Sequence, residues 1–133
     1  MEVVADTTVL IDLWRYRKTP RCLSDLTGKV GDAAILVPWI TQAEFSRGAL
    51  FKDVPAEALA EFHAGFQLLA FENAVIEHYC HLWVAMARKG QTPGYPDLWI
   101  AACAVAANAA VLTRNPKHFE GVPGLEVIAY KIA

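Results

Sequence analysis

The stretch VVADTTVLID at residues 3–12 decides the fold of this chain. It begins with a short apolar run that is typical of a strand buried on both faces of a parallel sheet. After Asp6 the apolar residues recur at helical spacing, and Thr7 or Thr8 can cap that helix with its hydroxyl. Asp6 is therefore predicted at the carboxyl edge of a parallel sheet, where open α/β sheets bind ligands. Taken alone, this stretch equally fits an Asp6 that only caps the helix.

Length and composition favour one domain spanning residues 1–133. The chain has 133 residues, of which 55% are hydrophobic and 20% charged, so it can form a substantial core. The formal net charge of −2 argues against a general nucleic-acid coating protein, which would usually be basic. Three cysteines without a CxxC pair are typical of free thiols in a reducing compartment. We therefore expect a cytoplasmic protein.

Three later junctions repeat the pattern of the first. Residues 34–37 predict a buried strand, after which Thr41 and Glu44 have the spacing of a capping box. Residues 90–96 predict a turn-rich loop, and Asp97 then opens an apolar helix. Residues 109–112 predict another buried strand, followed by Thr113 and Asn115. The fold class is thus α/β, a three-layer α/β/α domain with a mainly parallel sheet of about five strands.

Three carboxylates and one amide follow these strands or begin these helices: Asp6, Glu44, Asp97 and Asn115. Taken singly, Glu44 or Asp97 can serve only its own helix N-terminus. In a parallel sheet, however, such positions share one edge and predict one acidic pocket. Carboxylates brought together raise each other's pKa unless a cation lies among them, and hard oxygen ligands suit Mg²⁺ or Mn²⁺. Such an ion supports hydrolysis of phosphodiesters.

Four segments, in order, resemble the PIN-domain family and specifically VapC-type toxins. They are residues 4–11, 41–45, 96–102 and 112–119, and they span nearly the whole chain. The resemblance implies a PIN-like fold and a Mg²⁺- or Mn²⁺-dependent endoribonuclease. It also implies a cognate antitoxin chain that blocks the site, and toxin homodimers within a larger complex. Two departures are Thr8, where the family often has Asn, and Asn115, where many members have a fourth Asp.

The resemblance assigns roles to individual residues. Asp6 and Asp97 match acidic metal-binding positions, and Glu44 is either a third ligand or the group that orients the attacking water. Asn115 and Thr113 would position water or phosphate, with Thr7 as a further supporting residue. Basic residues near the predicted edge could contact RNA phosphates, although residues 15–21 taken alone are better explained as a solvated loop. The candidates are Arg15, Arg17, Lys18, Arg21, Arg47, Lys52, Arg114 and Lys117.

Four aromatic residues either belong to the core or form an apolar groove for an antitoxin helix. Core is the preferred assignment for Trp14, Phe45 and Phe51, whereas Tyr16 is expected to be exposed. Two other functions keep the same pocket or fold. One is a DNA nuclease or phosphatase, and the other is a non-catalytic binding subunit.

Overall fold

The computed structural model describes residues 2–91 and 94–133. Five strands are present in this part of the chain: β1 (Glu2–Ala5), β2 (Ala34–Pro38), β3 (Gln67–Leu69), β4 (Ala110–Thr113) and β5 (Val127–Ala129). The α-helices are α1 (Thr7–Arg15), α2 (Ser24–Val30), α3 (Trp39–Phe51), α4 (Ala56–His63), α5 (Asn73–Arg88) and α6 (Tyr95–Ala106). Two short 3₁₀ helices are η1 (Pro20–Leu23) and η2 (Pro116–Phe119). Residues 92 and 93 of the predicted loop lie outside the described residues.

The strands form one parallel sheet in the order β3-β2-β1-β4-β5. Strands β1, β2 and β3 succeed one another in one direction, and β4 and β5 extend the sheet in the other. The order therefore reverses between β1 and β4, which pair with Val4 opposite Val111. The crevice outside the carboxyl ends of two such strands is where open α/β sheets bind ligands. The topology thus singles out the residues that follow β1 and β4.

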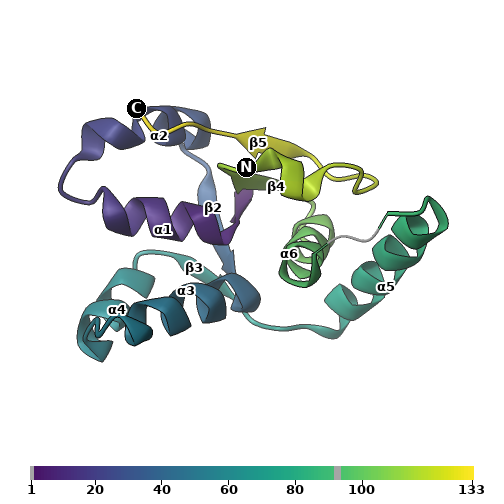
Figure 1. Ribbon diagram of the computed structural model, residues 1–133, viewed down its shortest axis with the longest axis horizontal. Helices are drawn as coiled ribbons and strands as arrows, with labels where there is room; N and C mark the ends of the chain where they lie inside the picture. The colour runs from purple at the N-terminus through teal and green to yellow at the C-terminus, as the bar shows by residue number, and fades with distance from the viewer. Residues whose placement is uncertain (1, 92–93) are drawn as a thin grey trace.

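Helices cover both faces of the sheet (Figure 1). Alternate residues of β1 point to opposite faces. Val3 packs among side chains of α1, α2, α3 and α4, whereas Val4 packs against α5 and α6. These two buried clusters are the core, and they confirm the predicted three-layer α/β/α arrangement with a five-stranded sheet.

At the first predicted helix cap the structure selects one of the alternatives, and the second predicted cap is wrong. Asp6, and neither Thr7 nor Thr8, is the N-cap of α1, with its Oδ1 accepting a hydrogen bond from the Thr7 N–H at 2.7 Å. Helix α3 begins at Trp39 behind Pro38, so no capping box forms at Thr41. Proline can precede a helix without cost because the N–H it lacks would have no helical partner. The buried Thr41 hydroxyl instead donates to the Ala5 carbonyl at 2.9 Å, tying α3 to the end of β1.

Two further observations bear on the sequence-based expectations. Cys22, Cys80 and Cys103 are free thiols, as predicted. Within the described ranges, no helix has both the length and the apolar character needed to cross a membrane.

Candidate functional site

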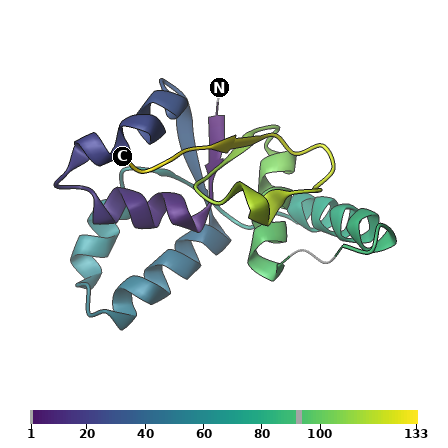
Figure 2. The same cartoon turned by 45° about the horizontal axis from the view of Figure 1, so that its top comes forward.

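The first turns of α1, α3 and α6 converge at the carboxyl end of β1 (Figure 2). Asp6 lies at the centre of this region and is only 4% exposed. Besides the amide of Thr7, it accepts hydrogen bonds at Oδ2 from the hydroxyls of Thr113, at 2.8 Å, and Thr8, at 3.1 Å. All three donors are neutral. The structure thus holds the Asp6 carboxylate in place without neutralising its charge. Asp6 both caps α1 and faces the site, although the sequence offered these two roles as alternatives.

Glu44 lies on the second turn of α3 and turns toward Asp6. The Thr7 hydroxyl donates to Glu44 Oε1 at 2.7 Å. Because the amide of Thr7 also donates to Asp6, this one residue links the two carboxylates. Arg47 Nη2 lies 4.0 Å from Glu44 Oε2, but the Arg47 side chain is largely exposed, so this pair is weak.

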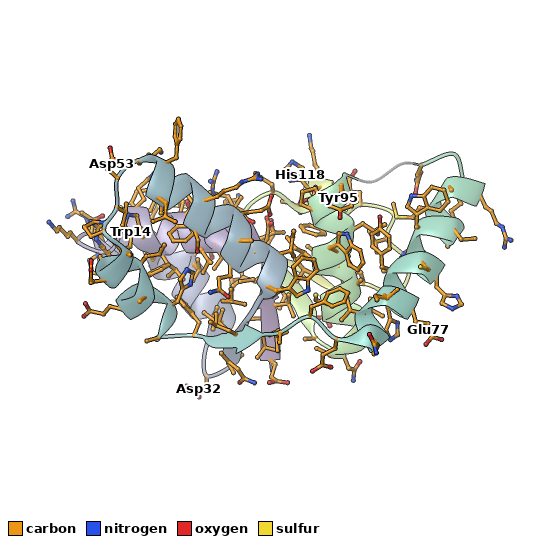
Figure 3. The ribbon with its side chains drawn as sticks, turned by 90° about the horizontal axis from the view of Figure 1, so that it is seen from below. Trp14, Asp32, Asp53, Glu77, Tyr95 and His118 are labelled. Atoms are coloured by element: carbon orange, nitrogen blue, oxygen red, sulfur yellow. The ribbon has the colours of Figure 1, made fainter. Side chains whose placement is uncertain are left out.

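Asp97 approaches from the opposite face of the sheet, in the first turn of α6. Burial raises the pKa of its carboxyl above the ordinary value, and the negative charges of Asp6 and Glu44 raise it further, while His118 lowers it. His118 Nδ1 lies 3.8 Å from Asp97 Oδ2. Figure 3 shows His118 together with Tyr95 at the start of α6. Asp97 therefore lies close enough to the other two carboxylates for their charges to disfavour its own.

The donor set fits a hard divalent cation. Carboxylate and hydroxyl oxygens are the ligands that Mg²⁺ and Mn²⁺ prefer, and a cation would relieve the repulsion that raises the Asp97 pKa. In residues 2–91 and 94–133, no three His, Cys, Asp or Glu side chains are gathered closely enough to form a complete metal cluster. Mg²⁺ usually keeps several waters and binds through one or two carboxylates together with substrate phosphate, so a looser arrangement suits this ion.

The residues after β4 complete the same region. The hydroxyl of Thr113 is fully buried, donates to Asp6 and accepts from the backbone N–H of Asn115 at 2.9 Å. Asn115 is thus brought to the site, where its backbone makes the contact. Its neighbour Arg114 donates from Nε to Asp12 Oδ2 at 2.8 Å. This buried Asp12 was not among the residues that sequence reasoning selected. The sequence feature that could have identified Asp12 is its position as an aspartate on the apolar face of the first helix.

A cavity of about 470 Å³ between α1 and α3 has Glu44 on its wall. Its other lining residues are apolar or basic: Ile11, Trp14, Arg15, Arg17, Phe45, Gly48, Ala49, Lys52 and Val54. Three of the predicted phosphate contacts, Arg15, Arg17 and Lys52, therefore lie beside the site. Lys18 and Lys117 are exposed and do not line this cavity.

The aromatic residues near the cavity differ from expectation at two positions. Phe45 is buried, but Phe51 at the end of α3 is 87% exposed. Tyr16, which was expected to be exposed, is half-buried. Phe51 ends the last turn of its helix, where no neighbouring element covers it, whereas Tyr16 at the C-cap of α1 is held by a backbone hydrogen bond to Asp12. Trp14 is half-buried, packs edge-on against Phe62 and lies beneath the guanidinium of Arg17 at 4.0 Å.

Known proteins resemble this chain in both sequence and fold. The PIN domain family model matches residues 3–125. A protein named ribonuclease VapC1 from Methanocaldococcus jannaschii is 28% identical over 119 residues, which cover 90% of this chain and 79% of that protein. The VapBC-1 structure from nontypeable Haemophilus influenzae matches with a TM-score of 0.79 and 25% identity, covering 97% and 98% of the two chains. The structure of VapBC2 from Rickettsia felis, bound to a promoter DNA fragment, matches with a TM-score of 0.82 and 23% identity, covering 98% of this chain and all of that one.

Proposed function

This chain belongs to the PIN-domain family, and from that premise we propose that it is a metal-dependent endoribonuclease, the toxin of a toxin–antitoxin pair. The observation that carries the proposal is the buried Asp6 at the switch point of the sheet, held by neutral donors beside Asp97 and Glu44. The name of the relative from Methanocaldococcus jannaschii and the VapBC structures support the same activity and an antitoxin partner.

The residues take distinct roles in the proposed reaction. Asp6 and Asp97 would hold Mg²⁺ or Mn²⁺, which supplies charge stabilisation for a phosphoryl transition state and lowers the pKa of water. Thr113 and Thr8 fix the orientation of Asp6 through their hydroxyls. The Thr7 hydroxyl occupies Oε1 of Glu44, and Oε2 remains to orient an attacking water or to serve as a third ligand.

The cavity between α1 and α3 offers a path for the RNA backbone. Arg15, Arg17 and Lys52 line it, and Glu44 lies on the same wall. Cationic side chains bind phosphates without regard to base sequence, so this path positions a strand at the carboxylates despite the net charge of −2. The remaining predicted phosphate contacts are Lys18, Arg21, Arg47, Arg114 and Lys117, and the Nε of Arg114 is already engaged by Asp12.

The decisive experiment is RNA cleavage by the purified, antitoxin-free chain with Mg²⁺, with Mn²⁺ and with EDTA. We expect cleavage that requires the metal and is lost in Asp6→Asn. Asp32→Asn, which removes one exposed carboxylate from the turn before β2, is the matched control and should cleave normally. Cleavage that persists in Asp6→Asn would place the activity elsewhere.

The same preparation separates the alternatives. Cleavage of DNA or hydrolysis of a small phosphate ester in preference to RNA would change the substrate class. Absence of cleavage on transfer, ribosomal and messenger RNA would favour a non-catalytic binding subunit. In that case Asp97→Asn would keep partner binding and have no effect on cell growth. If the protein is a toxin, the wild type arrests growth, Asp97→Asn does not, and co-expression of its antitoxin restores growth.

Two further properties belong to this proposal. Free cysteines are typical of the reducing cytoplasm, where RNA substrates are present, and we place the protein there. We also propose a homodimer within a larger complex with the antitoxin, which sedimentation of the purified complex would test.

A further inference from the structure

Behind the acidic site lies a second buried carboxylate, Asp12, which the proposed reaction does not use. It is 1% exposed. Its Oδ2 accepts two hydrogen bonds, one from Arg114 Nε at 2.8 Å and one from the Tyr130 hydroxyl at 2.7 Å. These three residues, here named the Asp12 cluster, come from α1, from the segment after β4 and from the segment after β5. Asp12 lies 102 positions from Arg114 and 118 positions from Tyr130 in sequence, and both donors meet at one of its oxygens.

The Asp12 cluster is poorly suited to a purely stabilising role. Asp12 Oδ1 is buried and has no hydrogen-bond partner in the described part of the chain. Taking the charge of Asp12 out of water costs several kcal/mol, and apolar residues of similar size often stabilise a fold equally well. The hydrogen bond and charge of Asp12 raise the pKa of Arg114, and burial, followed by the bond to Asp12, raises that of Tyr130. Both donors are therefore held in their protonated forms.

Hydrogen bonds connect the Asp12 cluster to the acidic site. The backbone N–H of Arg114 donates to the Thr8 hydroxyl at 3.2 Å, and that hydroxyl donates to Asp6. The backbone N–H of Tyr130 donates to the carbonyl of Thr113 at 3.2 Å, and the Thr113 hydroxyl donates to Asp6. Both residues whose hydroxyls hold Asp6 Oδ2 are thus bonded to backbone groups of the cluster, Thr8 through its hydroxyl and Thr113 through its carbonyl.

We propose that Asp12, Arg114 and Tyr130 are positioning residues that lock residues 113–115 against α1, so that Thr113 and Thr8 aim Asp6 into the site. The consequence for cleavage rests on the proposed ribonuclease function, whereas the locking of the segment does not. This inference assigns Arg114 a role different from the phosphate contact that the sequence predicted. Its side chain is 35% exposed, with Nε turned inward to Asp12.

Steady-state cleavage of an RNA oligonucleotide by Arg114→Gln distinguishes these two roles of Arg114. If the residue positions the segment, kcat falls by up to about 100-fold while KM and its salt dependence stay near the wild-type values, because misplacement affects the transition state. If it binds a phosphate, KM rises and kcat is retained. The slope of log KM against the logarithm of the salt concentration then falls by about 1. The second result, or no change at all, overturns the proposal.

A milder variant and a matched control guard against general destabilisation. Tyr130→Phe removes one hydroxyl and should also lower kcat, but by less than Arg114→Gln does. Asp25→Asn weakens a different fastening of the same C-terminal segment, because Asp25 Oδ2 accepts from the Lys131 N–H at 2.8 Å on the exposed surface. It should leave kcat unchanged. Equal losses of kcat in Tyr130→Phe and Asp25→Asn would reduce the cluster to a structural anchor and overturn the proposal.

Amide hydrogen exchange provides a readout that does not need catalysis. In Tyr130→Phe and Arg114→Gln the amides of Arg114 and Asn115, which donate to the Thr8 and Thr113 hydroxyls, should exchange faster than in the wild type and in Asp25→Asn. Unchanged exchange in both variants would overturn the locking. If the wild type cleaves no RNA, the proposed function fails, and the exchange rates still decide whether the Asp12 cluster locks residues 113–115.

Discussion

Asp6 and Asp12 lie six residues apart, one at the N-cap of α1 and the other within that helix, and both are almost completely buried. Their surroundings differ in charge. Asp6 accepts hydrogen bonds only from an amide and two hydroxyls, whereas Asp12 accepts from a guanidinium and a phenol. The protein therefore neutralises Asp12 internally, whereas the proposed function assigns the neutralisation of Asp6 to a bound cation. The two carboxylates are alike in burial and differ in the charge of their donors.

The largest expected effect is that of a substitution at Asp97, which lies in the same site as Asp6. Asp97→Asn should lower RNA cleavage more than about 100-fold, because several kcal/mol of charge stabilisation are lost. The free energy of unfolding should rise or stay constant at pH 7. The pKa of Asp97 is raised by burial and by Asp6 and Glu44, so its charged form opposes folding there. Cleavage rates measure the loss of activity, and denaturant unfolding measures the change in the free energy of unfolding. A less stable but active variant would contradict the assignment.

The opposite change in the free energy of unfolding, a decrease, is expected for a substitution at Asp12. Asp12→Ala should destabilise the fold by about 1.5–3 kcal/mol, the range for a lost hydrogen bond to a charged group. The full penalty for breaking a completely buried pair does not apply, because Arg114 can reach water. Thermal and denaturant unfolding measure the loss, and Asp6→Asn is the comparison. If Asp6→Asn destabilised the fold by the same amount, the two carboxylates would not differ as described.

Metal binding provides the third test of the comparison. Mn²⁺ at ten times its dissociation constant should raise the free energy of unfolding by about 1.4 kcal/mol, because it binds only the folded state. The increment should persist in Tyr130→Phe, whose metal ligands are intact, and vanish in Asp6→Asn. Thermal unfolding with and without Mn²⁺, with EDTA as the blank, measures it. An increment retained in Asp6→Asn would place the metal elsewhere.

The smallest effect concerns pH and the Asp12 cluster. Burial and the hydrogen bond to Asp12 raise the pKa of Tyr130 above its ordinary value of 10.0, so the folded state keeps a proton that the unfolded chain releases. The resulting stabilisation is complete below pH 10 and decreases as the pH rises further. Between pH 9.5 and 11, wild type should lose about 1 kcal/mol more stability than Tyr130→Phe. Parallel curves for the two proteins would show that Tyr130 is not held in its protonated form.

The sequence predicted the part of the site that depends on strand ends. Short β-branched runs followed by polar residues placed Asp6 and Thr113 at the edge of a parallel sheet, and the order β3-β2-β1-β4-β5 brings the ends of β1 and β4 together. Helix starts were less predictable. Thr41 has the spacing of a capping box, but its hydroxyl binds Ala5 because α3 packs against the end of β1. Tertiary contact prevailed there over local capping preference.

Long-range partners were beyond reach of the sequence. Arg114 follows a strand as a phosphate-binding residue would, and no local pattern shows that its Nε meets Asp12, 102 positions away. The exposures of Tyr16 and Phe51 were likewise misjudged, because the exposure of an aromatic residue at a helix end depends on which elements lie over it. Hydrophobic periodicity reports which face is buried and says nothing of what covers the ends.

By itself the sequence determined the α/β class, the parallel sheet and the choice of Asp6, Glu44 and Asp97, because strand and helix periodicity and the position of polar residues after strands are local properties of the chain. Only the tertiary structure decided that Asp6 and Asp12, two buried aspartates of one short segment, have opposite surroundings. The donors that distinguish them arrive from β4 and from the segment after β5, and such contacts form only when the whole sheet is assembled.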